Sequence, residues 1–401
     1  MRAYKVELDL NDRQRTMLLQ HAGAARWAYN YGLRRKIDAR TTKQKAPTAI
    51  DLHKEIVILK HSTTPWLEEV SKCAPQQALR NLDVAFKNFF KRCKDKAKRK
   101  GFPKFKSRKR GIGSFTLEGA VSATDRTVSL PRIGDLRLKE RGYVPADVKI
   151  KSVVVSERAG RWFVSVRTVE DFPERQSGAE VLGIDVGISQ LAVLSDGTRF
   201  ENPRALRGSE HRLRLLQKSV SRKKKGSSNR KKAVARVARQ HYRVACIRSD
   251  AIHKMTSVIT KRASLIGIET LNVAGMLKNH CLAKSLADAS LSEIHRQITY
   301  KAEWSRIPVV KADRFFPSSK MCSGCGVVED ELDLSTRVFV CSACGLEIDR
   351  DWNAAINLKN LAVSSTVTAC RPGSSGSDRK VRTKLLVGQE PKTRLDVVLY
   401  G

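Results

Sequence analysis

Four cysteines with metal-ligand spacing give the strongest chemical signal in the sequence. Two CxxC pairs are separated by fifteen residues: Cys322, Cys325, Cys341 and Cys344. This spacing lets two short knuckles converge tetrahedrally on one zinc ion. A glycine follows each pair, Gly326 or Gly345, and permits a tight turn that points backbone N–H groups at the thiolates. Two disulfides are the alternative, but the chain opens without an apolar signal segment, so we expect a reducing compartment and one structural Zn²⁺.

Three carboxylates lie in apolar patterns that make them candidate ligands of a divalent cation. Asp185 lies within VLGIDVG, and Glu269 closes the apolar run SLIGIE. Burying a carboxylate costs several kcal/mol unless it is paired or binds a metal. Asp351 precedes small residues at helical spacing, which could pack that helix on a sheet: Ala354, Ala355 and Leu358.

Two of these acids also have an ordinary alternative. Asp349 and Asp351 could be helix N-caps, and Glu269 could end a strand in a turn. Any one of them alone is more often structural than catalytic. The joint pattern favours a shared site, because three acids of a basic protein cannot all stay charged beside phosphate without cations between them. Two Mg²⁺ ions about 3.5–4 Å apart would activate an attacking water and stabilise the leaving oxygen of a phosphodiester.

The charge balance indicates a polyanionic partner. The chain has 401 residues, enough for two or three domains, and 77 Lys and Arg against 40 Asp and Glu give a net charge of +37. Nucleic acid is the natural polyanion for such a protein. An anionic membrane is a weaker alternative, since the basic runs lack a Trp/Leu-rich amphipathic face and no apolar run could span a bilayer. The other cysteines show no pairing pattern and are expected to be plain thiols: Cys73, Cys93, Cys246, Cys281 and Cys370.

Two basic stretches are candidate nucleic-acid contacts. Residues 91–110 hold twelve Lys/Arg and one Asp, together with Phe102 and Phe105, and residues 221–243 hold ten Lys/Arg and no acid. A charge run is usually a solvated face, but runs this one-sided favour phosphate contact, with some stacking by the aromatic rings. The residues predicted to make these contacts are Lys104, Lys106, Arg108, Lys223, Lys224, Lys225, Lys231 and Lys232.

Hydrophobic periodicity divides the chain into two regions. Residues 3–10 alternate as a strand, and Asn11 with Gln14 forms a capping box that opens a helix. Its Trp27, Tyr29 and Tyr31 are expected to pack rather than stack on bases. A second helix carries apolar residues at three- and four-residue spacing between positions 78 and 90, and residues 115–168 predict a small antiparallel barrel or sheet. From residue 181 to 362, alternating strands and helices predict an α/β sheet.

The order GIDVG, GIET, two CxxC pairs and DRDWNAA resembles the split RuvC-type nuclease domain of the TnpB family, transposon-encoded relatives of type V CRISPR effectors. RWAYNYGL, GFPKFKSR and LPRIG are similar to motifs of the family's amino-terminal half, so the resemblance covers residues 3–362. It implies a multidomain α+β fold. A wedge-like β-barrel (1–10 and 111–175) holds an inserted helical recognition domain (11–110), and an RNase H-like RuvC α/β nuclease domain (181–312 and 349–362) holds an inserted zinc ribbon (313–348). A basic, disordered tail is expected at 363–401.

The resemblance also implies a function. It makes Asp185, Glu269 and Asp351 the catalytic residues that bind two Mg²⁺ ions, and Asp351 rather than Asp349 is the third acid. The expected activity is RNA-guided DNA cleavage beside a short flanking motif, with a guide RNA from the transposon end and double-stranded target DNA as partners. We expect a cytoplasmic, nucleoid-associated prokaryotic protein that does not need to oligomerise. A non-cleaving, guide-directed repressor and an RNase H-like transposase are the alternatives.

Overall fold

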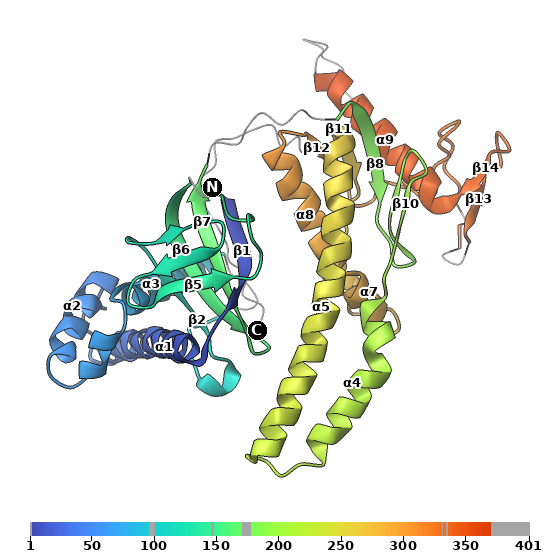
Figure 1. The fold of residues 1–401 in the computed structure, drawn as a ribbon. Coiled ribbons are helices and arrows are strands. Elements are labelled where there is room, and N and C mark those ends of the chain that lie inside the picture. Colours follow the sequence, from blue (N-terminus) through green and yellow to red (C-terminus); the bar gives the residue numbers. More distant parts are fainter. Residues whose placement is uncertain are drawn as a thin grey trace. The chain divides into compact units, whose positions relative to one another are not determined.

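The computed structural model describes residues 2–95, 101–145, 148–170, 178–330, 332–333 and 336–369. The chain divides into two compact units, Met1–Asp171 and Phe172–Gly401, each with its own hydrophobic core (Figure 1). Parts of three predictions lie outside the described residues: the basic residues at 96–100, the end of the predicted wedge barrel at 171–175 and the tail from 370 onward, with Cys370.

The first unit contains one antiparallel sheet and a group of helices inserted after its first strand. Its elements are β1 (Arg2–Asp9), α1 (Asp12–Thr41), α2 (Ala49–Lys60), η1 (Pro65–Glu69), α3 (Cys73–Lys94), η2 (Arg108–Arg110), β2 (Ser114–Leu117), β3 (Ser122–Ala123), β4 (Thr127–Leu130), β5 (Gly134–Leu138), β6 (Lys149–Arg158) and β7 (Arg161–Val169). The sheet has the order β2-β6-β7-β1-β5-β4-β3. β1 thus lies between β7 and β5, and its pairing with β7 brings the first and last strands of the unit together. The strand pairings form one sheet, and its closure into the predicted barrel stays a prediction.

The first helix begins where the sequence predicted. Asn11 and Gln14 form a reciprocal capping box, in which the Gln14 backbone N donates to Asn11 Oδ1 (2.8 Å) and the Asn11 N to Gln14 Oε1 (3.1 Å). Trp27 stacks on Tyr31 with ring centroids 5.4 Å apart, and Tyr29 is buried. The packing interpretation of these rings is therefore confirmed.

The second unit is built on a five-stranded mixed sheet covered by helices on both faces. Its elements are β8 (Glu180–Asp185), β9 (Gln190–Leu194), β10 (Arg199–Glu201), α4 (Ala205–Ser221), α5 (Ser228–Arg262), β11 (Ala263–Ile268), α6 (Val273–Met276), α7 (Ala283–Ala289), α8 (Leu291–Trp304), β12 (Val309–Lys311), β13 (Val338–Val340), β14 (Glu347–Asp349) and α9 (Arg350–Ala369). The order is β10-β9-β8-β11-β12, in which β8, β11 and β12 are parallel and β9 is antiparallel to β8 and β10.

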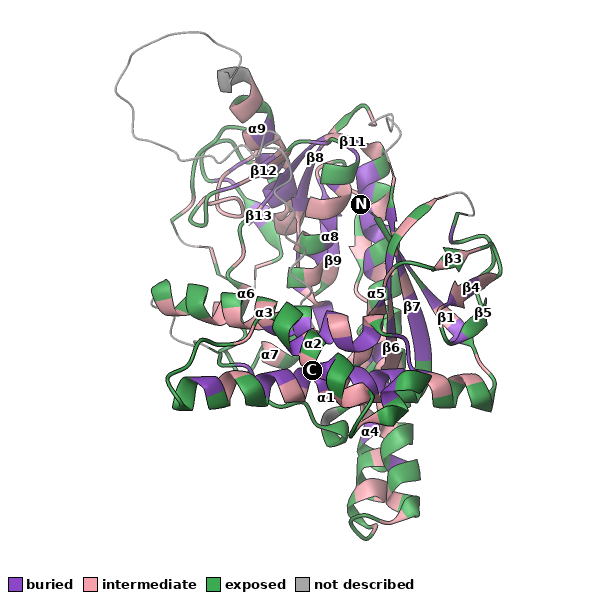
Figure 2. Cartoon of the chain, turned by 90° about the vertical axis from the view of Figure 1, so that its left-hand side faces the viewer, coloured by how far each residue is buried: buried purple, intermediate pink, exposed green. Residues whose placement is uncertain are grey.

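Strand alternation explains how this sheet holds different helices on its two faces. Leu182 and Ile184 of β8 join a buried cluster with Ile259 of α5 and Ile294 of α8. The opposite face packs against α9, where Ala362 is buried. Figure 2 shows the buried residues of these elements in purple. α9 continues to Ala369, so the prediction that a disordered tail begins at residue 363 is wrong for residues 363–369.

Candidate functional site

Two parallel strands place Asp185 and Glu269 side by side. Both strands end in the same pattern, Gly-Ile-acid: Gly183, Ile184 and Asp185 on β8, and Gly267, Ile268 and Glu269 on and after β11. The pairing is in register, with Gly267 opposite Gly183 and Ile268 opposite Ile184. The next residue of each strand is the acid. Because side chains alternate across a strand, each acid lies on the same face as its glycine, which is the face covered by α9.

The two glycines let α9 rest directly on the strand backbones. A Cβ atom at Gly183 would lie 1.9 Å from the carbonyl oxygen of Ala355, and one at Gly267 would lie 2.2 Å from that of Leu358. No other residue type fits at either position without separating the helix from the sheet. The buried face of α9 contains the small and apolar residues that the sequence predicted, Ala354, Ala355 and Leu358, and Ala362 extends it.

The beginning of α9 is fixed by Asp349, which directs Asp351 toward the other two acids. Asp349 Oδ1 accepts hydrogen bonds from the backbone N of Asp351 (3.1 Å) and Trp352 (3.0 Å), and its Oδ2 pairs with Arg199 at 3.3 Å. The N-cap alternative is therefore confirmed for Asp349. Arg350 Nη2 lies 3.3 Å from Asp351 Oδ1 and keeps a positive charge at the site.

The electrostatics show that the three acids share one environment. Burial raises the pKa of Asp185 well above its usual range, the negative charges of Glu269 and Asp351 raise it further, and Arg350 lowers it. Burial also raises the pKa of Glu269 to about 7; a hydrogen bond from the Val186 backbone opposes this shift, and Asp351 adds to it. Both residues keep some accessible surface, but their carboxylates lie among protein atoms, so desolvation is the main cause. Both carboxyls resist ionisation unless a cation is present.

The three acids supply the oxygen ligands of a divalent-cation site. Carboxylate oxygens are the ligands that Mg²⁺ prefers, so the donor set fits that ion. Three carboxylates can be shared between two neighbouring ions.

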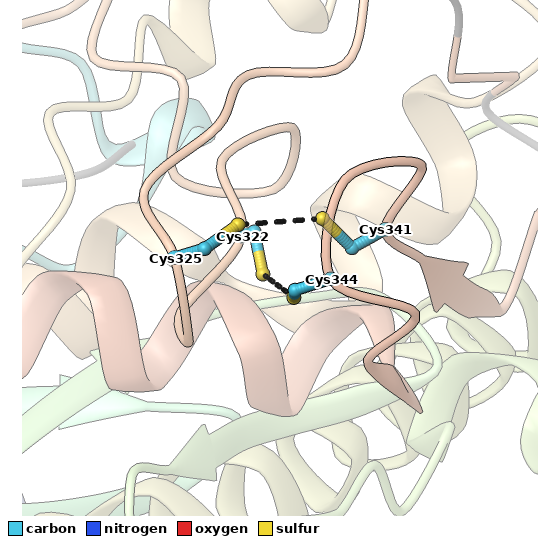
Figure 3. Close-up of side chains that lie close together, drawn as sticks. All are labelled: Cys322, Cys325, Cys341 and Cys344. Atoms are coloured by element: carbon cyan, nitrogen blue, oxygen red, sulfur yellow. Dashed lines mark hydrogen bonds between the residues drawn. The ribbon is translucent and has the colours of Figure 1, made fainter.

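The four cysteines converge as their spacing predicted (Figure 3). The Sγ atoms of Cys322 and Cys344 are 3.6 Å apart, and those of Cys325 and Cys341 are 3.5 Å apart. Four sulfurs about 2.3 Å from a tetrahedral zinc lie about 3.8 Å from one another, whereas a disulfide joins its sulfurs at about 2.05 Å. The distances fit a Cys₄ site that can hold one zinc ion and exclude disulfides among these cysteines.

The two zinc knuckles have the same backbone geometry. Gly326 N donates to Cys322 O (2.9 Å), and Gly345 N donates to Cys341 O (3.0 Å). Both glycines have positive φ, +80° and +72°, which only glycine adopts readily. This confirms the tight turns predicted after each CxxC pair.

Two buried asparagines fasten the ribbon to α9, and sequence reasoning did not identify them. Asn353 Nδ2 donates to Met321 O (2.8 Å), and its Oδ1 accepts from Ser323 N (2.9 Å), so it holds the backbone on both sides of Cys322. Asn357 Nδ2 donates to Met321 O (2.6 Å) and Ser318 O (2.8 Å). Both side chains are almost completely buried. Asn353 lies two residues after Asp351, so the zinc knuckle and the third acid are held by the same helical turn.

The predicted basic contacts of the first unit, Lys104, Lys106 and Arg108, are all exposed as whole residues. The Lys106 ammonium nevertheless lies 4.2 Å from the centroid of the Tyr29 ring, and desolvation there lowers the pKa of this lysine. Its backbone N also donates to Asn30 Oδ1 at 2.7 Å. Lys106 therefore fastens the basic segment to α1. Contact of these three residues with nucleic acid stays a prediction.

Lys223, Lys224, Lys225, Lys231 and Lys232 lie at the tip of the α4–α5 hairpin, drawn yellow-green in Figure 1. Lys223 is partly buried, and the other four are exposed. Arg230, in the same stretch, instead donates through Nη1 to the Val220 carbonyl (2.7 Å) at the end of α4. The hairpin thus presents a basic tip whose binding role stays a prediction.

Three family models match successive parts of the chain. The model described as "Helix-turn-helix domain" matches residues 1–45, "Probable transposase" matches residues 163–280, and "Cas12f1-like, TNB domain" matches residues 292–358. The last match contains the cysteine group and ends within α9. With the mixed sheet and the cysteine group, these matches define the class as OrfB_IS605-type proteins of transposons.

Full-length relatives identify the family within that class. A protein of Streptomyces pristinaespiralis named "Putative RNA-guided DNA endonuclease" is 35% identical over 396 residues, which cover 98% of this chain and 96% of the relative. An Escherichia coli (strain K12) protein, "Putative RNA-guided DNA endonuclease InsQ", is 31% identical and covers 92% of this chain and 94% of its own length. The chain belongs to the TnpB (OrfB_IS605) family.

A solved structure supports the fold. A Cas12f1 chain in a cryo-EM structure with sgRNA and target DNA superposes with a TM-score of 0.50 at 16% identity, covering 86% of this chain and 82% of that chain. The similarity shows a shared mixed α/β fold with several sheets. Among the helices that the structure describes, none has the length and apolar character needed to cross a membrane.

Proposed function

We propose that the protein is an RNA-guided, Mg²⁺-dependent DNA endonuclease of an insertion-sequence transposon, which cuts target DNA beside a short flanking motif. The observation that carries this proposal is the convergence of Asp185, Glu269 and Asp351 at one end of the mixed sheet, where the first two carboxyls have raised pKa values. Two relatives that match this chain over nearly their full length are named RNA-guided DNA endonucleases, and these names support the proposal.

The proposal assigns a role to each part of the chain. Residues 181–312 and 349–362 form the RuvC-like nuclease domain, with residues 313–348 as its zinc ribbon. Residues 1–10 and 111–175 form the wedge domain, and residues 11–110 form the recognition domain. The ligand position at the carboxyl ends of β8 and β11 is the one expected for open α/β sheets. The basic segments and hairpin tip would contact nucleic-acid backbones, while base pairing with a guide RNA supplies sequence specificity.

The chemistry assigned to the acids follows from their arrangement. When bound, two Mg²⁺ ions supply an activated water and charge stabilisation at the leaving oxygen of the phosphodiester. The negative charges of Glu269 and Asp351 both raise the pKa of Asp185, and that of Asp351 also raises the pKa of Glu269. All three carboxylates would therefore hold the ions together. The guanidinium of Arg350 lies beside Asp351, so a positive charge is next to the third acid even when no metal is bound.

Asp185→Asn tests the assignment and separates lost chemistry from misfolding. The variant is expected to lose Mg²⁺-dependent cleavage of target DNA by the purified ribonucleoprotein while it keeps RNA binding. Because it removes a desolvated carboxylate, it should also raise the melting temperature of the metal-free protein at pH 8. Asp250→Asn is the matched control, because Asp250 is exposed and pairs with Lys254 on the surface of α5 at 2.8 Å. Its cleavage rate and melting temperature should equal those of the wild type.

Cleavage by Asp185→Asn at the wild-type rate would refute the proposed site. If the wild type binds its RNA and target DNA but never cuts with Mg²⁺ and the correct flanking motif, the protein is a guide-directed repressor. Joined DNA strands among the products would identify a transposase.

A further inference from the structure

A pocket of about 490 Å³ opens on the first unit between α1, η1 and the segment that contains Arg108. Its volume lies within the range of small-ligand sites, roughly 300–1,000 Å³. Its lining combines a glycine and an arginine of α1, Gly23 and Arg26, with Trp66 of η1. The proposed cleavage chemistry uses none of these residues.

Gly23 is the feature that packing does not explain. It lies inside the 30-residue helix α1, where glycine is less favourable than alanine, and it has ordinary helical backbone angles. A Cβ atom at Gly23 would have one neighbour within 4 Å, Arg26 Nη2 at 3.9 Å. Gly32 of the same helix is different, because its Cβ would lie 2.8 Å from Leu79 Cδ2. Neighbouring side chains require Gly32, whereas Gly23 leaves space that opens into the pocket.

Trp66 supplies an aromatic ring at the pocket. Its side chain is 41% exposed, although one edge packs on Trp27 at a centroid distance of 5.7 Å and an interplanar angle of 85°. Trp27 in turn stacks on Tyr31, so Trp66 belongs to a packed group of three aromatic rings. A fixed and exposed indole is a platform on which a nucleobase can stack.

Two arginines give the pocket a positive charge on the side toward the basic segment. Arg26 donates through Nη1 to the Ile112 carbonyl at 3.2 Å, which fixes its guanidinium at the pocket wall. Arg108 is exposed and lies in the basic segment. Guanidinium groups beside an aromatic platform suit a phosphate next to a stacked base.

A polar pair completes the lining. Gln20 Nε2 donates to Glu69 Oε2 at 3.2 Å, which leaves the amide oxygen and further carboxylate lone pairs as acceptors. A carboxylate that accepts from a ribose 2′-hydroxyl distinguishes RNA from DNA. An acid in a pocket that is otherwise positive would weaken binding of a phosphate alone, so it favours a ligand that also carries a hydroxyl donor.

We propose that this pocket binds one unpaired nucleotide of an RNA strand, with the base on Trp66, the phosphate at Arg26 and Arg108, and the 2′-hydroxyl at Glu69. Because Gly23 has no side chain, the ribose or base can approach the backbone of α1 there. The site goes beyond the proposed nuclease function and rests on it only for the expectation that an RNA partner exists.

Gly23→Ala tests the proposal, because stability and binding should change in opposite directions. The full-length protein, freed of nucleic acid, is titrated with a fluorescent, unstructured RNA octamer without Mg²⁺, and its melting temperature is measured. We expect Gly23→Ala to melt at a higher temperature than the wild type but to bind the RNA at least about five-fold more weakly. Gly208→Ala in α4 is the matched control, since no neighbour lies within 4 Å of its Cβ position. It should melt higher with unchanged affinity.

Two further measurements locate the ligand. Ultraviolet cross-linking of the same RNA, followed by peptide mass spectrometry, should label the peptide containing Trp66, and Trp66→Leu should lose that label and bind at least about five-fold more weakly. Unchanged RNA affinity in both Gly23→Ala and Trp66→Leu would overturn the proposal. An equal loss of affinity for a DNA octamer of the same sequence would overturn its assignment to RNA. Because cleavage is not measured, neither result bears on the proposed nuclease site.

Discussion

Gly183→Ala is predicted to separate α9 from β8 and thereby displace the third acid. The new Cβ atom would lie 1.9 Å from the carbonyl oxygen of Ala355 and 2.4 Å from the backbone N of Lys359. Real Cβ atoms essentially never approach another heavy atom more closely than 3.0 Å. The helix and strand must therefore move apart by at least about 1.1 Å (3.0 − 1.9). Neither neighbour can turn away, because both are backbone atoms of α9.

This displacement has a cost in stability and a larger one in activity. Over-packing of a well-packed core costs roughly 1–3 kcal/mol, and each kcal/mol lowers the melting temperature of a unit of this size by about 2–4 °C. Asp351 moves with α9, and a misplacement of about 1 Å in a catalytic site can cost about 100-fold in rate. Cleavage by Gly183→Ala should therefore fall by about that factor under conditions in which the protein remains folded.

A second glycine provides an internal comparison. At Gly267 the Cβ would lie 2.2 Å from the Leu358 carbonyl oxygen, so the required separation is about 0.8 Å (3.0 − 2.2). Gly267→Ala should be less destabilised and less impaired than Gly183→Ala. Melting temperature by calorimetry, and cleavage rates at 10 °C below each variant's own melting temperature, measure the two effects. Wild-type melting and cleavage in Gly183→Ala, or a larger effect in Gly267→Ala, would refute the close packing of α9 as the device that positions Asp351.

Three further predictions concern the ribbon and the acids. Asn353→Leu breaks two hydrogen bonds beside Cys322 and should destabilise the unit by about 1–3 kcal/mol, with faster zinc transfer to a chromophoric chelator; an unchanged transfer rate would contradict the link. Cys341→Ser removes a thiolate ligand and should lower zinc from one ion per chain to none by elemental analysis. The pKa of Glu269 rises from 4.5 to about 7 on folding, so the stability that its neutral form contributes is present below pH 4.5 and is lost as the pH rises through 7. Glu269→Gln should flatten this decline in metal-free melts between pH 5 and 8, and an equal decline in both proteins would be inconsistent with the shift.

Sequence patterns predicted the elements of this protein well where each pattern is local. The capping box at Asn11, the glycines after each CxxC pair and the small face of α9 each depend on a few neighbouring residues, and the structure has all three. Convergence of the three acids was also predictable, since Gly-Ile-acid occurs at the end of two strands. The repeat indicates equivalent positions on parallel neighbours, although the reason for the glycines becomes visible only with α9 packed on them.

Features that depend on distant side chains could not be predicted. Asn353 and Asn357 look like ordinary polar positions of a helix, and their role arises because a loop more than thirty residues earlier in the chain lies against them. Lys106 looked like a free cation, but Tyr29 and Asn30 come from a helix far away in the sequence. The end of α9 was placed too early because the serine- and threonine-rich composition after Ala362 is typical of a loop, whereas the helix continues through Ala369.

The position of α9 gives the order of synthesis a consequence. A ribosome that has completed residue 349 has already made the ribbon cysteines, the basic segment, the basic hairpin tip and two of the three acids. The helix that carries Asp351 and covers β8 and β11 has not yet been made. On the proposed function, a nascent chain can begin to gather RNA before it is able to cut anything. A stop codon just before α9 would remove Asp351 permanently and would also uncover the sheet face that α9 buries, so the loss of cutting would come with a loss of stability in this unit.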